Sequence, residues 1–345
     1  MFGLASSAGV FGAIADMLVD IYILSGYGPL VKWVDDFFVI RLPHHSWSEK
    51  DFIELTASIG IPWSPEKLRP LASVQRYIGF DWHLDSKTVS LPPEKLARIQ
   101  EMVQNWLDDN ARMSAHDASS LHGKLVHISC ILTLIRPFIC SIVVFSGKFL
   151  SFRARLSSPP SVKADLRWVQ QLLRILPNHV TLKCSVPRDL DWWGDASTFF
   201  GIGITVSSLW AVWRWADRVS IGSRKHFNIG WAEAVAVELA LLVAITEKVL
   251  VPGHFLVCSD NEGVVSVLNK GRSRSHNTNK VLKRIYSSLA LHNLHISAIY
   301  IPSRSNVTDA LSRGDIKAFL LGFPKAQHRA HIPLPAHLSQ LLVPL

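Results

Sequence analysis

The sequence predicts an α/β (α+β) fold in at least two parts, on three observations. Short apolar strands meet at tight turns in residues 1–90, and helical periodicity dominates residues 91–152. From residue 191 onward, strand-like runs give way to alternating helices and strands. With 345 residues, 48% of them hydrophobic, the chain has enough apolar surface for a substantial folded core and is not largely disordered.

The charge balance favours a polyanionic partner. Lys and Arg number 36 against 27 for Asp and Glu, which gives a net charge of +9. Such an excess is most simply matched by nucleic acid.

The four cysteines form no C-x-x-C pair and lie in apolar runs: Cys130, Cys140, Cys184 and Cys258. They indicate buried thiols in a reducing compartment, so we expect an intracellular protein of the cytoplasm or nucleus.

Two apolar stretches invite a membrane or secretion interpretation, and neither fits it. Residues 1–15 have no basic region before them and are interrupted at Asp16, so they do not form a secretory signal. Residues 125–144 are broken by Arg136 and Pro137, which favours a buried helical pair over a membrane span. We therefore expect no secretion and no membrane partner.

The first part begins with a turn of small residues, 3–9, and a helix from about Val10. Residues 31–40 then form two short apolar strands that meet at the adjacent acids Asp35 and Asp36. Asp is a favoured turn residue, so a plain hairpin turn accounts for the pair. Paired carboxylates on a rigid hairpin can also hold Mg²⁺ against a triphosphate. The spacing leaves both interpretations open.

The middle part is predicted to be helical. Pro92 and Pro93 suit a helix start. A core-facing stripe at helical spacing follows: Ile99, Met102, Val103 and Trp106. Residues 117–145 continue as helices, the polar and proline-broken residues 153–161 indicate a linker, and a short helix is expected at 164–176.

The last part is predicted as three strands, a long helix, a strand, two helices and a final strand. The expected bounds are 191–198, 199–206, 209–215, 231–249, 255–258, 262–269, 278–292 and 295–301. Three aspartates lie within these elements or shortly after them. Each also has a local structural explanation that requires no metal and no catalytic role. Asp195 suits a turn, Asp260 with Asn261 suits a helix cap, and Asp309 suits a helix first turn.

A glutamate in the long helix is the fourth acid. Glu233 is followed at helical spacing by Val237, Ala240, Leu241 and Ala244. A carboxylate on such a face is costly to bury unless something cationic meets it. Glu238 lies on an almost equally apolar face, so periodicity leaves the choice between the two glutamates open.

Motifs in the first part resemble those of retroelement reverse transcriptases. The run Phe2-Gly3-Leu4-Ala5-Ser6-Ser7-Ala8-Gly9-Val10-Phe11 resembles their template-handling motif, and Trp33-Val34-Asp35-Asp36 resembles their palm hairpin. The run Tyr77-Ile78-Gly79-Phe80-Asp81-Trp82 resembles the primer-grip hairpin, and Leu91-Pro92-Pro93-Glu94-Lys95-Leu96 the start of the thumb.

The last part is similar to the ribonuclease H domain of the same retroelements. It shares their element order and ends in Asn306-Val307-Thr308-Asp309-Ala310-Leu311-Ser312-Arg313. The likeness is greatest to LTR or DIRS-like retrotransposons. It implies a truncated reverse-transcriptase palm, thumb and connection, followed by a ribonuclease H-like domain with a five-stranded mixed sheet. The implied division is 1–90 (partial palm), 91–152 (thumb and connection helices), 153–187 (linker with a short helix), 188–320 (ribonuclease H-like domain) and 321–345 (tail).

The resemblance also implies a set of functional residues. The catalytic and metal-binding acids would be Asp195, Glu233, Asp260 and Asp309, holding two Mg²⁺ or Mn²⁺ ions about 4 Å apart. Asp35 and Asp36 would belong to a polymerase site that lacks its upstream strand, so we expect no DNA polymerisation by this chain alone. Residues expected to bind nucleic acid are Gly3, Tyr77, Gly79, Lys95 and Arg304. Many family members have a histidine just before the last acid, and this chain has none there, which puts that accessory role in doubt.

The implied activity is metal-dependent cleavage of the RNA strand in RNA–DNA hybrids, with primer–template nucleic acid as a partner. An upstream polymerase fragment or a second copy of the chain would complete the polymerase half. Two alternatives stay open: a catalytically inactive remnant or structural nucleic-acid-binding subunit, and a recombinase or transposase that uses the same clustered acids.

Overall fold

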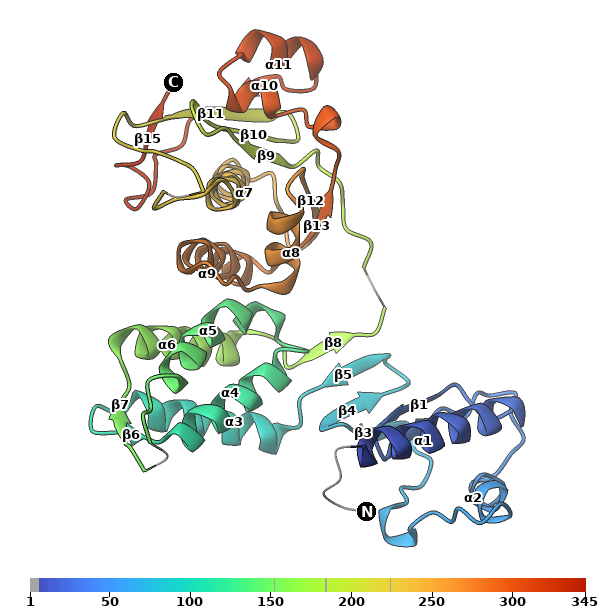
Figure 1. Ribbon diagram of the computed structural model, residues 1–345. Coiled ribbons are helices and arrows are strands. Elements are labelled where there is room, and N and C mark those ends of the chain that lie inside the picture. The colour runs from blue at the N-terminus through green and yellow to red at the C-terminus, as the bar shows by residue number, and fades with distance from the viewer. Residues whose placement is uncertain (1–5, 152, 184, 224) are drawn as a thin grey trace. The chain divides into compact units, whose positions relative to one another are not determined.

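The computed structural model describes residues 6–151, 153–183, 185–223 and 225–345 (Figure 1). They form two compact units. The first comprises Met1–Leu96 and Asn178–Lys183, and the second comprises Ala97–Pro177 and Cys184–Leu345. Gly3 and the start of the predicted template-handling motif lie outside the described residues. The predicted five-part division stays a prediction.

The first unit contains both predicted hairpins. Its elements are α1 (Ser7–Leu24), β1 (Leu30–Trp33), β2 (Asp36–Val39), α2 (Glu49–Ala57), a 3₁₀ turn (Pro65–Lys67), β3 (Val74–Tyr77), β4 (Phe80–His83), β5 (Thr88–Ser90) and β8 (His179–Thr181). Trp33 pairs with Asp36, so Val34 and Asp35 form a two-residue turn. In the second hairpin, Ile78 and Gly79 occupy the turn with φ of 44° and 77°, as tight hairpin turns require.

Two details of this unit differ from the expectation. Helix α1 begins at Ser7, not at about Val10, because small residues of the expected turn join the helix. Residues 179–181, expected in a linker, form β8 at the edge of the sheet β3-β4-β5-β8.

Helices make up the middle of the chain. They are α3 (Pro93–Leu107), α4 (Ala115–Ile128), α5 (Arg136–Ser146) and α6 (Pro160–Ile175), with a 3₁₀ turn at Thr133–Ile135 and a short pair of strands, β6 (Arg112–Met113) and β7 (Leu156–Ser157). The predicted stripe on α3 is confirmed at Ile99, Val103 and Trp106, which are buried. The expected linker is shorter than predicted, because β7 pairs with β6 and α6 already begins at Pro160, a residue type that suits a first helical turn.

The C-terminal part of the second unit is built on a mixed sheet. Its strands are β9 (Trp193–Ala196), β10 (Gly201–Val206), β11 (Leu209–Trp215), β12 (Gly253–Ser259), β13 (Leu294–Tyr300), β14 (His328–Arg329) and β15 (Leu342–Pro344). The order is β13-β12-β9-β10-β11, with β14 and β15 both paired to β11. β9, β10 and β11 are antiparallel, whereas β12 runs parallel to both β9 and β13.

The predicted order of strands and helices is confirmed, but within the described residues the sheet has seven strands, where five were predicted. The C-terminal segment supplies the two additional strands. They cover the backbone groups that β11 would otherwise leave unpaired at the sheet edge.

Helices cover both faces of this sheet (Figure 1). They are α7 (Ile229–Thr246), α8 (Glu262–Lys270), α9 (His276–Leu291), α10 (Asp309–Ser312) and α11 (Ile316–Gly322). α7 packs on β9, where a Cβ on Gly194 would meet Ala236 at 3.1 Å. α10 packs on β10, where a Cβ on Gly203 would meet the Ser312 nitrogen at 2.7 Å. Glycine at these two strand positions therefore lets both helices approach β9 and β10 closely.

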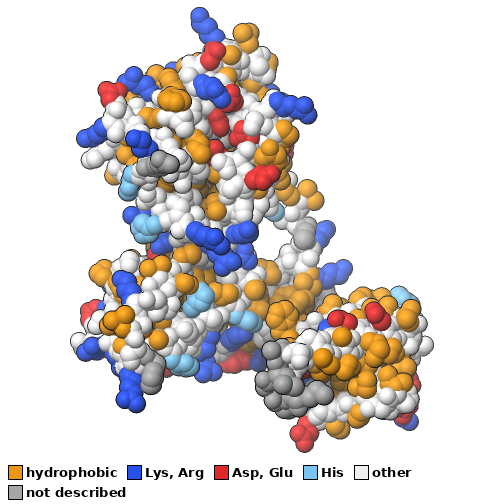
Figure 2. Space-filling model, in the orientation of Figure 1, with side chains coloured by type: hydrophobic (Ala, Val, Ile, Leu, Met, Phe, Trp, Pro, Cys, Tyr) orange, Lys and Arg blue, Asp and Glu red, His pale blue; other side chains and the backbone are white. Residues whose placement is uncertain are grey.

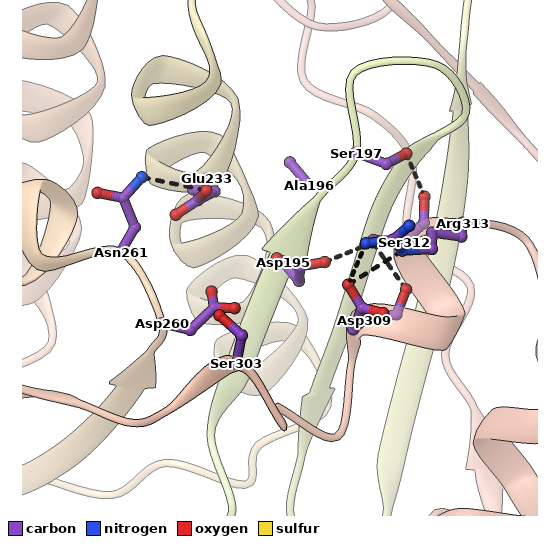
Figure 3. A pocket seen from close by; sticks show the side chains of 10 residues that line it. All are labelled: Asp195, Ala196, Ser197, Glu233, Asp260, Asn261, Ser303, Asp309, Ser312 and Arg313. Carbon is purple, nitrogen blue, oxygen red and sulfur yellow. Dashed lines mark hydrogen bonds and ion pairs between the residues drawn. The ribbon is translucent and has the colours of Figure 1, made fainter. Parts of the chain in front are cut away.

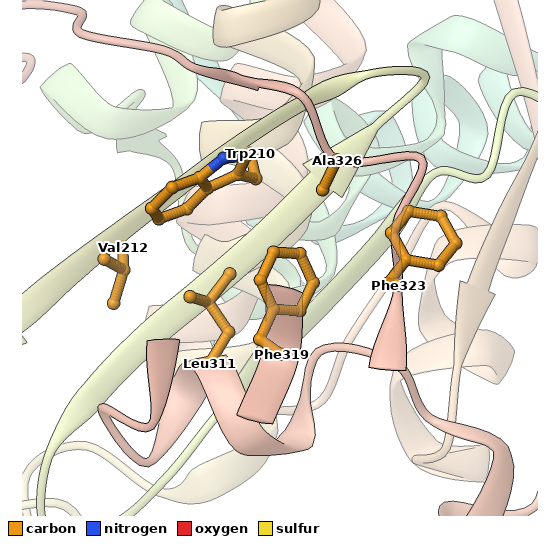
Figure 4. Close-up of a cluster of buried hydrophobic side chains, with 6 residues drawn as sticks. All are labelled: Trp210, Val212, Leu311, Phe319, Phe323 and Ala326. Carbon is orange, nitrogen blue, oxygen red and sulfur yellow. The ribbon is translucent and has the colours of Figure 1, made fainter. Parts of the chain in front are cut away.

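An apolar cluster anchors α10 and α11 (Figure 4). Leu311 and Phe319 pack against Trp210 and Val212 of β11, with Phe323 and Ala326 beside them. Leu311 has no exposed surface. This packing holds the two short helices, and with them Asp309, in a defined position.

Two of the described helices, α1 and α7, are long and apolar enough to cross a membrane by length and composition. In α7, 72% of the residues are buried within the protein, so its apolar composition is accounted for by the core. In α1, 17% are buried.

Candidate active site

All four predicted acids of the C-terminal part line one hollow of about 310 Å³ (Figure 3). Asp195 lies on β9, Glu233 in the first turns of α7, Asp260 directly after β12, and Asp309 at the start of α10. Because β9 and β12 are parallel neighbours, Asp195 and Asp260 come to the same end of the sheet. Figure 2 shows acidic side chains gathered in this region with basic side chains around them.

Three of the acids form a tight group. One oxygen from each of Asp195, Glu233 and Asp260 lies within 4.8 Å of the other two. Of the two oxygens of Glu233, Oε2 is buried and has no hydrogen-bond partner. An orphaned buried carboxylate oxygen is costly, and hard divalent cations prefer oxygen ligands of this kind. The donor set therefore fits Mg²⁺ or Mn²⁺.

Asp309 stands apart from this group. Its Oδ1 accepts hydrogen bonds from Arg313, from Nε at 3.0 Å and from Nη2 at 2.9 Å. Its side chain is 45% exposed. The fourth acid thus lines the hollow but is engaged by a cation four residues later on the same short helix.

Two neutral side chains orient the buried acids. Ser312 donates a short hydrogen bond from Oγ to Oδ2 of Asp195, and Ser197 donates to the Ser312 carbonyl oxygen at 2.6 Å. Asn261 donates from Nδ2 to Oε1 of Glu233 at 3.2 Å. The hydrogen bonds from Ser312 and Asn261 each fix one carboxylate oxygen, of Asp195 and Glu233 respectively, and leave the other oxygen for a ligand.

Asn261 also decides the helix-cap question for Asp260. The Asn261 Oδ1 accepts from the backbone nitrogens of Gly263 at 2.9 Å and Val264 at 3.2 Å, so Asn261 is the cap of α8. Asp260 is left to face the hollow. The sequence interpretation considered Asn261 only as part of a possible helix cap with Asp260, and it assigned no role to Ser312 or Arg313, although both lie in the closing motif with Asp309.

The surroundings of the two buried acids, Asp195 and Glu233, favour the protonated form of each carboxyl group. Burial raises the pKa of Glu233 to about 8, against the lowering effect of Asn261 and with the charges of Asp195 and Asp260 adding to the rise. Burial also raises the pKa of Asp195, partly offset by the Ser312 hydrogen bond and reinforced by Asp260 and Asp309. A cation in the hollow would reverse this preference by favouring the ionised carboxylates.

We expect the metal-free protein to lose stability as pH rises from about 4.5 to about 8. Glu233 ionises near 4.5 in an unfolded chain and near 8 in the folded one, so the folded state binds more protons between these values. Each pKa unit corresponds to about 1.4 kcal/mol, which predicts a loss of a few kcal/mol. Urea unfolding in chelator at about pH 5 and about pH 8 measures it. A Glu233→Gln variant with the wild-type pH dependence would contradict the assignment.

The second glutamate of α7 lies in a different environment. Glu238 accepts from Arg284 Nε at 2.6 Å and Nη2 at 2.8 Å, and from His337 Nε2 at 3.0 Å. Burial raises its pKa, but the hydrogen bonds from His337 and Arg284 outweigh this effect, so the pKa lies below its usual range. Glu233 is therefore the glutamate that faces the hollow, and Glu238 is the one that is held in an ion pair.

The predicted polymerase residues are spread along the first unit. Asp35 and Asp36 are exposed at the hairpin, and among the described residues no third carboxylate joins them in a group fit for a metal. Tyr77 is 8% exposed, and its hydroxyl donates to the Asp36 carbonyl oxygen at 3.3 Å. Lys95 donates to the Gly79 carbonyl oxygen at 3.0 Å.

In the second unit, Arg304 is exposed in the 3₁₀ turn Ser303–Ser305, and its neighbour Ser303 lines the hollow. Whether Arg304 binds nucleic acid stays a prediction, as it does for Tyr77, Gly79 and Lys95.

Comparison with known proteins gave no matching family model and no matching curated protein. Among solved structures, the chain is similar to a foamy viral protease–reverse transcriptase in complex with an RNA/DNA hybrid, at 13% identity and a TM-score of 0.39. The match covers 89% of this chain and 40% of that one, so the chain spans less than half the length of this structure. A second is the N-terminal ribonuclease H domain of a Mycobacterium tuberculosis protein fused to maltose-binding protein. There the identity is 16%, the TM-score 0.26, and the match covers 38% of this chain and 94% of that one.

Proposed function

We propose that this chain is a metal-dependent nuclease of the ribonuclease H type that cleaves the RNA strand of RNA–DNA hybrids. The observation that carries the proposal is the group formed by Asp195, Glu233 and Asp260, which a strand, a helix and the residue after a second strand bring to within 4.8 Å. The resemblance of the motifs supports an origin in an LTR or DIRS-like retrotransposon, inside a cell.

The three grouped acids would hold a divalent cation, with Asp309 as a fourth ligand at a second ion. Such ions supply an activated water and a charge that steadies the leaving oxygen of a phosphodiester. Residues of the chain itself position the carboxylates and the attacking water. Ser312 fixes the Asp195 carboxylate, Asn261 fixes Glu233, and the free Oδ2 of Asp309 can accept a hydrogen bond from the attacking water.

The net charge of +9 suits a nucleic-acid substrate. Recognition of a hybrid would rest on backbone charge and the RNA 2′-hydroxyls, without reading base sequence. A primer–template, an upstream polymerase fragment and a second copy of the chain remain proposed partners.

The test is incubation of the purified chain with an end-labelled RNA–DNA hybrid, with Mg²⁺ and with chelator. We expect RNA-strand cleavage only with the metal, and Mn²⁺ to replace Mg²⁺. Binding without cleavage would favour the inactive remnant or structural subunit. Cleavage of duplex DNA in preference to the hybrid would favour the recombinase or transposase.

A further inference from the structure

Arg313 is the one cation among the ten described residues that line the hollow (Figure 3). The same lining contains four carboxylates. A phosphodiester that enters this hollow brings further negative charge, and the guanidinium is the group of the lining that attracts it. Arginine also suits the task chemically, because its planar donors match phosphate oxygens in pairs.

The geometry leaves Arg313 free to take a second partner. Its Nε and Nη2 donate to the same oxygen of Asp309, at 3.0 and 2.9 Å, so three of its five N–H donors are unused. Its side chain is 68% exposed. An exposed ion pair between residues four apart on a helix is weak, so little opposes an exchange of partners.

The backbone that carries Arg313 is, in contrast, firmly held. Leu311 is fully buried in the apolar cluster, and the glycine at position 203 lets α10 lie directly on β10. The packing of α10 therefore fixes the backbone position from which the exposed Arg313 side chain extends.

We propose that Arg313 binds the phosphodiester of the substrate, a role that rests on the proposed nuclease function. In the free protein the guanidinium is held by Asp309. When the nucleic acid enters, a phosphate replaces Asp309 as the partner of Arg313. The Asp309 carboxylate is then released toward the hollow at the moment that the substrate is in place.

The experiment measures binding of a fluorescently labelled RNA–DNA hybrid to the full chain by anisotropy, in chelator so that no cleavage intervenes. We expect Arg313→Ala to weaken binding roughly tenfold and to reduce the salt-dependence slope by about one. Arg313→Lys, which keeps the charge, should recover part of the loss. With Mg²⁺ present, KM should rise more than kcat falls.

Arg214→Ala is the matched control. Arg214 is 52% exposed and pairs with Asp217 three residues later, but it does not line the hollow. It should bind the hybrid as the wild type does.

The outcomes separate this inference from the proposed function. If Arg313→Ala binds as tightly as the wild type and only its melting temperature changes, Arg313 is a structural ion pair and the inference is wrong, while wild-type cleavage still supports the function. If the wild type binds the hybrid without cleaving it and Arg313→Ala weakens that binding, the inference stands and the nuclease proposal fails. A wild type that neither binds nor cleaves overturns both.

Discussion

Asp195→Asn is expected to abolish metal-dependent cleavage of the hybrid, by roughly 10³-fold or more. Asp195 belongs to the three-acid group and also accepts the Ser312 hydrogen bond, which joins that group to α10. Removing its charge removes a ligand for the cation, and such cations contribute several kcal/mol to transition-state stabilisation. The amide has nearly the shape of the carboxylate and can still accept from Ser312, so the fold should persist.

The measurement is a single-turnover cleavage assay, with circular dichroism to verify folding. Asp191→Asn is a matched control on the segment that leads into β9. Asp191 pairs with Lys325 at 2.8 Å and does not line the hollow, so its variant should retain cleavage. Full activity of a folded Asp195→Asn protein would remove the metal-site interpretation.

The two glutamates of α7 are expected to give opposite results. Glu233→Gln should abolish cleavage and, without metal at about pH 8, be at least as stable as the wild type, because a group that resists ionisation is replaced by a neutral one. Glu238→Gln should retain cleavage and lose roughly 2–3 kcal/mol of stability. Breaking a buried ion pair costs somewhat more, but the Arg284 side chain is 33% exposed and regains some hydration.

Cleavage rates and urea unfolding of the two variants side by side test this pair of expectations. Arg284→Ala provides a second measurement, because it leaves Glu238 buried without its bidentate partner and should destabilise the protein at least as much as Glu238→Gln. A reversed ranking, with Glu238→Gln inactive and Glu233→Gln active, would place the wrong face of α7 at the hollow.

Local sequence patterns are enough to predict the hairpins, the helices and the order of elements in the C-terminal part. Hairpin turns and helix stripes depend on residues within a few positions of one another, as along α3 and at the first hairpin, where the turn lies at Val34–Asp35, one residue before the predicted Asp35–Asp36. The bounds are less well predicted at α1 and α6, since small residues and proline are compatible with both a loop and a first helical turn. The four acids that line the hollow were named by the resemblance of the motifs, since residue patterns alone left other roles open for each of them.

The tertiary structure alone decided which of these residues act together. Glu233 and Glu238 have nearly equivalent helical neighbours, and only the approach of Arg284 and His337 from distant parts of the chain distinguishes them. The same holds for the Ser312 hydrogen bond to Asp195, 117 residues apart, and for β14 and β15, which are too short to show a periodic pattern. By itself the sequence determined the local elements and the chemical types of the site. Contacts between residues that are far apart in the sequence leave no signature in local periodicity, so only the packing of the folded chain determines them.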